Sequence, residues 1–139
     1  MKRYYIAYGS NLSEEQMARR CPTATIVGTT TLKDWRLLFN GPASIEQFEG
    51  YEVPVLIWDI KPNDEKNLDI YEGYPRYYRK EMLKIKVNDQ KVDAMVYIMN
   101  TNRESRPTKG YYDILDQGYE RFGFNKKILE TALQESEMY

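Results

Sequence analysis

The stretch YYIAYGSNLSEEQ, residues 4–16, joins an aromatic and apolar run to a polar segment. Residues 3–8, RYYIAY, predict a β-strand because they are rich in aromatic and apolar side chains. Ser13, followed three residues later by Gln16, is typical of a capping box, and it predicts a helix over residues 13–20. A glycine, a hydroxyl and an amide therefore lie between the end of a strand and the start of a helix.

The loop formed by Gly9, Ser10 and Asn11 has two interpretations. Glycine can adopt a positive φ and lets another group approach the backbone closely. The N–H groups at a helix N-terminus can hold a carboxylate, and Ser10 and Asn11 add side-chain donors. The stretch lacks both the Gly-Lys-Ser/Thr ending and the G-x-G-x-x-G pattern of nucleotide-binding loops. The other interpretation is a plain strand–turn–helix corner, and the pattern alone leaves both open.

The composition narrows the classes of partner. The chain has 139 residues, which suits a single domain over residues 1–139 with its own core. Lys and Arg total 20 against 21 Asp and Glu, a net charge of −1, so we expect neither nucleic acid nor an anionic membrane as a partner. No apolar run approaches the roughly 20 residues that a bilayer span needs. The short, tyrosine-rich start is unlike a signal peptide, so we expect a cytoplasmic protein.

The chain contains no histidine and a single cysteine, Cys21. An intrachain disulfide, a thiolate metal cluster, a Ser-His-Asp triad and a histidine-ligated zinc site are therefore excluded within one chain. If the protein is an enzyme, its acid–base group must be a carboxylate, lysine, tyrosine, cysteine or N-terminal amine. Cys21 has no basic partner nearby in the sequence and is interpreted as a small apolar filler.

The rest of the chain alternates strand and helix signals. Strands are predicted over 23–40 (one or two strands) and 51–60, a turn over 40–44, a helix over 61–73, a hairpin from 77–87 and 91–99, a loop over 100–110, and helices over 111–122 and 125–136. The strands lie too close together for a regular βαβ series. We therefore expect an α+β domain whose mixed or mostly antiparallel sheet could curl into a small β-barrel flanked by helices.

A second constellation lies at the end of the predicted helix over 61–73. Leu68 and Glu72 are four residues apart and Tyr71 is three from Leu68, so all three share a face. If Leu68 and Tyr71 face the core, Glu72 is carried into apolar surroundings at the helix end. Burial disfavours the charged carboxylate and raises its pKa, which suits a general acid or base near neutral pH.

Each of these residues also has a structural interpretation. Glu72 could be a solvated surface residue, or a carboxylate paired with Arg76 or Arg79. Tyr78 and Tyr97 lie on the predicted hairpin, where they could line a pocket or simply pack. Residue types and spacing alone do not choose between these interpretations.

Three segments together resemble the gamma-glutamyl cyclotransferase-like family: YIAYGSNL, LDIYEGYPRYYRKEMLKI and DAMVYIM. Their order and spacing hold from about Arg3 to Met99. The first motif has the Tyr-Gly-Ser-Asn form rather than the Tyr-Gly-Thr-Leu form of some relatives. The resemblance implies a small mixed β-barrel flanked by helices. It also implies a reaction without metal or cofactor, in which a γ-glutamyl amide, a small-molecule substrate, is cyclised to 5-oxoproline and an amine is released.

The same resemblance implies the site residues. Glu72 matches the catalytic glutamate of the family. The residues matched to substrate binding are Tyr5, Ile6, Ala7, Tyr8, Gly9, Ser10, Asn11, Tyr78 and Tyr97. Tyr78 matches another pocket tyrosine of the family, although the segment after Gly73 is one residue shorter than in some relatives.

Three functions stay open at this point: a γ-glutamyl cyclotransferase, a non-catalytic module that binds a small molecule, and an enzyme acting on another acyl amide. The sequence does not identify the leaving amine, although the segment after Asn100 could border it. The oligomeric state is also open, a homo-oligomer included.

Overall fold

The computed structural model describes residues 2–137. In chain order its elements are β1 (Arg3–Ala7), the 3-10 helix η1 (Ser10–Leu12), α1 (Glu14–Arg20), β2 (Thr25–Phe39), β3 (Ala43–Ile60), α2 (Pro62–Glu72), β4 (Tyr78–Val87), β5 (Gln90–Met99), α3 (Lys109–Phe122) and α4 (Lys126–Ser136). Among these residues, no helix combines the length and apolarity that crossing a bilayer requires.

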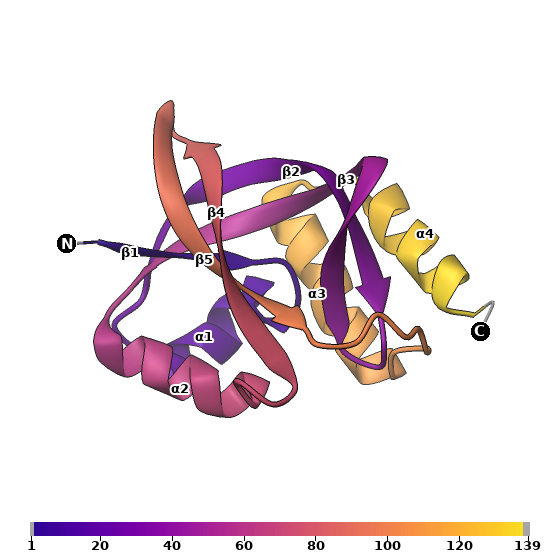
Figure 1. The fold of residues 1–139 in the computed structure, drawn as a ribbon, viewed down its shortest axis with the longest axis horizontal. Helices are drawn as coiled ribbons and strands as arrows, with labels where there is room; N and C mark the ends of the chain where they lie inside the picture. Colours follow the sequence, from indigo (N-terminus) through magenta and orange to yellow (C-terminus); the bar gives the residue numbers. More distant parts are fainter. Residues whose placement is uncertain (1, 138–139) are drawn as a thin grey trace.

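The strands form one five-stranded sheet in the order β2-β3-β1-β5-β4. β1 pairs in parallel with β5, where Tyr4 lies opposite Ala94, and the other pairs are antiparallel. Helices α1 and α2 lie together near one end of the sheet, and α3 and α4 lie near the long strands β2 and β3 (Figure 1). The fold is therefore α+β with a mixed sheet, as the sequence predicts.

The expectation of a closed barrel is wrong. β2 and β4 are the two edge strands, and no backbone ladder joins them in the described part of the chain. They approach at one end, where Asn88 Nδ2 donates to the Val27 carbonyl at 2.8 Å. A barrel needs a continuous register of backbone hydrogen bonds around the sheet, and a single side-chain bridge does not supply it.

The antiparallel pair of β2 and β3, here called the β2–β3 arm, extends over more residues than the sequence predicts. The predicted segment 23–40 contains one strand, β2 (Thr25–Phe39), with register shifts at Ile26/Gly28 and Lys33/Trp35. β3 begins at Ala43 rather than at 51, because its polar first half pairs with β2 and gains its hydrogen bonds there. β1 pairs only with the last part of β3, so Pro54 has β2 on one side alone, where its missing N–H is tolerated.

Local capping and turn signals are confirmed. The Ser13 side chain accepts the Gln16 N–H at 3.2 Å and starts α1. Gly73 ends α2 in the left-handed region with φ 66°. Asn88 and Asp89 both have positive φ and form the two-residue turn of the β4–β5 hairpin.

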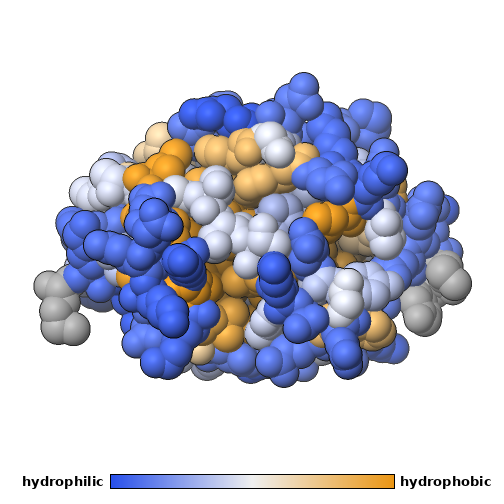
Figure 2. Space-filling view, turned by 90° about the horizontal axis from the view of Figure 1, so that it is seen from above, coloured by the Kyte–Doolittle hydropathy of each residue, from blue (hydrophilic) through white to orange (hydrophobic). Residues whose placement is uncertain are grey.

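The core gathers on the central strands. Ile6 of β1, Leu56 and Ile57 of β3 and Met95 of β5 are fully buried. Figure 2 shows one face of the molecule, on which hydrophobic patches lie among hydrophilic side chains. Because β1 lies between two other strands, the loop that follows it starts from a firmly packed position.

Candidate active site

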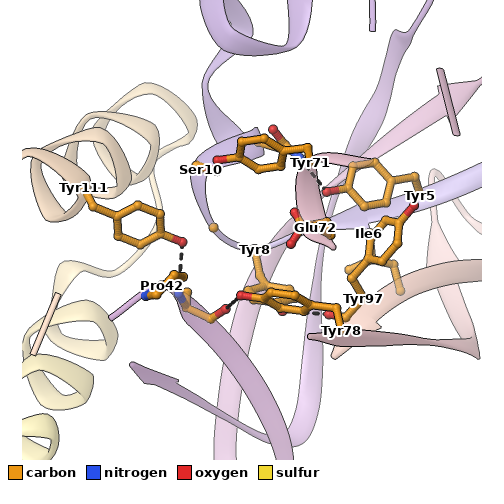
Figure 3. Close-up of a pocket in the computed structure, with 13 residues that line it drawn as sticks. Tyr5, Ile6, Tyr8, Ser10, Pro42, Tyr71, Glu72, Tyr78, Tyr97 and Tyr111 are labelled. Atoms are coloured by element: carbon orange, nitrogen blue, oxygen red, sulfur yellow. Dashed lines mark hydrogen bonds between the residues drawn. The ribbon is translucent and has the colours of Figure 1, made fainter. Parts of the chain in front are cut away.

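A cavity of about 260 Å³ opens where the end of β1 meets the last turn of α2 (Figure 3). Six tyrosines and one glutamate contribute to its walls. The lining residues are Tyr5, Ile6, Tyr8, Gly9, Ser10, Asn11, Pro42, Ala43, Tyr71, Glu72, Tyr78, Tyr97 and Tyr111. Segments that are far apart in the sequence therefore meet around one small space.

The structure brings Glu72 together with most of the residues that the resemblance assigns to substrate binding. Ala7 is the exception. It pairs with Leu56 in the sheet, is buried in the core and does not line the cavity. Their roles in binding and catalysis stay predictions at this point.

Glu72 is the last residue of α2 and points into the cavity (Figure 3). Burial raises the pKa of its carboxyl to about 7, and the positive charge of Arg20 opposes that rise. Within residues 2–137 the Glu72 carboxylate makes no hydrogen bond or ion pair, while Arg79 is engaged by Glu81 at 2.6 Å. A carboxyl with such a pKa and no protein partner can accept or donate a proton near neutral pH.

Tyr71 does not face the core as the helical spacing predicts. Leu68 is fully buried, but Tyr71 is 45% exposed and forms part of the cavity wall. Its hydroxyl lies 2.9 Å from Ser10 Oγ, and the Arg20 guanidinium lies 3.4 Å from the centre of its ring. The last turn of α2 lies at the rim of the cavity, so the inward positions are Leu68 and Glu72, four residues apart.

Hydrogen bonds hold the other tyrosine rings in place. The hydroxyl of Tyr8 donates to the Tyr97 carbonyl at 2.7 Å, and that of Tyr78 donates to a backbone carbonyl at 2.8 Å. The Tyr5 hydroxyl accepts from Asn11 Nδ2 at 2.8 Å. Burial raises the pKa of Tyr5, Tyr8, Tyr78 and Tyr97, so these phenols stay neutral at physiological pH.

The surroundings of Gly9 disfavour a larger residue, for a reason that only partly matches the prediction. Its φ is −120°, so no positive φ is involved. A Cβ on Gly9 would lie 3.0 Å from the Tyr111 hydroxyl, which is tighter than ordinary contact. That hydroxyl accepts the Ala43 N–H at 3.0 Å and so approaches the loop closely. Tyr111 comes from α3, and no sequence signal placed it at the site.

Tyr97 is anchored from outside the cavity. Its hydroxyl donates to Asp69 Oδ1 at 2.6 Å, and Lys80 Nζ lies 2.8 Å from the same oxygen. Lys80 also contacts Glu65 at 2.6 Å. Asp69 is three residues before Glu72 on α2, so one helix positions both the carboxyl in the cavity and the tyrosine opposite it. Sequence reasoning missed this ion-pair cluster because its members come from α2 and β4.

Comparisons with known proteins agree with this architecture. The family model described as gamma-glutamyl cyclotransferase, AIG2-like, matches residues 5–121. The chain is 26% identical over 140 residues to a gamma-glutamylcyclotransferase of Mus musculus, covering 91% of this chain and 74% of that protein. It is 28% identical over 134 residues to the Homo sapiens gamma-glutamylcyclotransferase, covering 86% and 71%.

Among solved structures, a gamma-glutamyl cyclotransferase superimposes with a TM-score of 0.82 at 26% identity, covering 95% of this chain and 86% of the other. The chain belongs to the gamma-glutamyl cyclotransferase, AIG2-like family. The fold and the family are thereby established together.

Proposed function

We propose that this protein is a γ-glutamyl cyclotransferase, which converts a small γ-glutamyl amide to 5-oxoproline and a free amine. The observation that carries the proposal is Glu72, a carboxyl that has no hydrogen-bond or ion-pair partner among residues 2–137, lies in a tyrosine-lined cavity and has its pKa raised to about 7. The names of the relatives supply the reaction class.

In the proposed reaction, the α-amine of the glutamyl group attacks its own γ-carbonyl carbon. The new C–N bond closes the five-membered ring and the original amide C–N bond breaks. Glu72 takes the proton that the α-amine loses and delivers a proton to the leaving nitrogen, so the carboxyl returns to its starting state. Both reacting groups belong to one molecule, so holding the chain folded supplies part of the acceleration.

The loop after β1 would bind the polar end of the substrate. N–H groups at the start of η1, with the side chains of Ser10 and Asn11, would hold the α-carboxylate or the developing oxyanion. The neutral tyrosine rings surround Glu72 with low-polarity surface, which strengthens such polar contacts. A bare Gly9 lets the substrate and Tyr111 approach the same stretch of backbone.

The test is release of 5-oxoproline from γ-glutamyl amides, measured for the native protein, Glu72→Gln and a control. Glu49→Gln is the matched control, because Glu49 is exposed on β3 and lies outside the cavity. We expect product from the native protein and Glu49→Gln, and a rate at least about 100-fold lower from Glu72→Gln.

Full turnover by folded Glu72→Gln would refute the role of Glu72. If the native protein forms no product but is stabilised thermally by γ-glutamyl compounds, the protein is a binding module instead of an enzyme.

A further inference from the structure

A second cavity, of about 600 Å³, lies on the far side of Glu72. It shares Pro42, Tyr71, Glu72 and Tyr78 with the tyrosine-lined cavity. Glu72 therefore lines both spaces. The segment after β5 contributes Asn100 to the wall of this second cavity.

The walls of the second cavity combine apolar surface with positive charge. Ile70 is 81% exposed and Tyr77 is 61% exposed, although both are large hydrophobic side chains. Met99 adds to the apolar wall. The Arg76 guanidinium lies 5.5 Å from the centre of the Tyr77 ring and, within residues 2–137, forms no salt bridge. Among the described residues that line this cavity, Glu72 is the only acid.

The proposed reaction determines which part of the substrate lies there. The leaving nitrogen must lie within reach of Glu72 to receive its proton. If the glutamyl group occupies the tyrosine-lined cavity, the substituent on that nitrogen extends past Glu72 into the second cavity. This surface therefore contacts the leaving group, and its chemistry decides which amines are released.

Resting on the proposed function, we infer that the preferred substrates are γ-glutamyl amides of amino acids with large apolar side chains. The apolar side chain of the leaving amino acid packs on Ile70, Tyr77 and Met99, and its carboxylate pairs with Arg76. Cationic amines are disfavoured, because Arg76 repels them and no acid besides the reacting Glu72 lines the described wall.

The experiment compares four substrates by kcat/KM for 5-oxoproline release. γ-Glutamyl-phenylalanine has both features, γ-glutamyl-phenethylamine lacks the carboxylate, γ-glutamyl-glycine lacks the apolar side chain, and γ-glutamyl-putrescine carries a cation. We expect γ-glutamyl-phenylalanine to exceed the glycine substrate by about 10-fold and the phenethylamine substrate by about five-fold. The putrescine substrate is expected to be the poorest.

Two variants assign the preference to residues. Ile70→Asn should reduce the advantage of phenylalanine over glycine, and its high exposure makes unfolding no concern. Arg76→Gln should lower kcat/KM for γ-glutamyl-phenylalanine about five-fold more than for γ-glutamyl-phenethylamine. Lys66→Gln is the control, because Lys66 is exposed on α2 and lines neither cavity.

The outcomes separate the two proposals. Equal kcat/KM for all four substrates, or a preference for putrescine, would overturn the inference while 5-oxoproline formation still supports the proposed function. Unchanged preferences in both variants would also overturn it. Absence of 5-oxoproline from every substrate would overturn the proposed function and this inference together.

Discussion

Replacing Glu72 by glutamine tests the environment of the candidate catalytic carboxyl without any substrate. Burial holds the pKa of Glu72 at about 7 in the folded protein, against 4.5 for an ordinary glutamate. Between these values the folded state binds more protons than the unfolded state. The stability that native Glu72 contributes is therefore lost as pH rises from 4.5 to 7. Glutamine has no proton to lose, so the Glu72→Gln protein avoids this loss.

The shift from 4.5 to about 7 sets the size of the effect. At ~1.4 kcal/mol per pKa unit, the ionised carboxylate costs about 3 kcal/mol of folding stability above pH 8. For a domain of this size, that corresponds to a difference in Tm of about 10 °C.

The assay is thermal unfolding followed by circular dichroism from pH 4 to pH 9 for both proteins. The quantity of interest is how the difference in Tm changes with pH, because any fixed packing cost of glutamine cancels. We expect the difference to move in favour of Glu72→Gln between pH 4.5 and 7.5 and to level off above. Glu49→Gln controls for removing one carboxylate at an exposed position.

A Tm difference that stays constant across this range would refute the reasoning, since it would mean that Glu72 ionises equally easily in the folded and unfolded states. A shift in favour of the native protein as pH rises would show that a positive charge stabilises the carboxylate. Either result would remove the physical basis for Glu72 as an acid–base group at neutral pH.

Two further substitutions test the surroundings. Gly9→Ala places a Cβ 3.0 Å from the Tyr111 hydroxyl, so we expect kcat/KM to fall about 10-fold in a folded protein; a native rate would contradict the close-approach argument. Arg36→Met removes a buried guanidinium bonded to the carboxylates of Glu46, Glu104 and Glu135, and should cost about 3 kcal/mol by urea denaturation. A cost below about 1 kcal/mol would show that the three carboxylates find other partners or solvent.

Several features could be predicted because their causes lie within a few residues. The Ser13 cap of α1, the left-handed Gly73 and the Asn88–Asp89 turn each depend on local backbone chemistry. The burial of Leu68 and the inward direction of Glu72 follow from helical spacing. The resemblance to the family then predicted that Glu72 and the loop at residues 9–11 belong to one site.

Other features were misjudged because distant segments decide them. β3 starts at Ala43 because β2 supplies its hydrogen bonds, and the sheet stays open because no backbone ladder pairs its edge strands β2 and β4 in the described part of the chain. Tyr71 faces the cavity because α2 ends at its rim. None of these long-range contacts can be predicted from the local pattern of residue types.

The sequence by itself determined most element types and the absence of histidine chemistry, since composition and short-range spacing carry that information. The resemblance to the family, rather than spacing, pointed to Glu72 as the candidate glutamate. Only the tertiary structure decided what surrounds Glu72. Tyr111 reaches Ala43 across 68 positions of the chain, and the second cavity forms where α2 meets the end of β5. Packing between segments far apart in sequence buries the Glu72 carboxyl, and this burial raises its pKa. The same packing brings together the residues that line the two cavities.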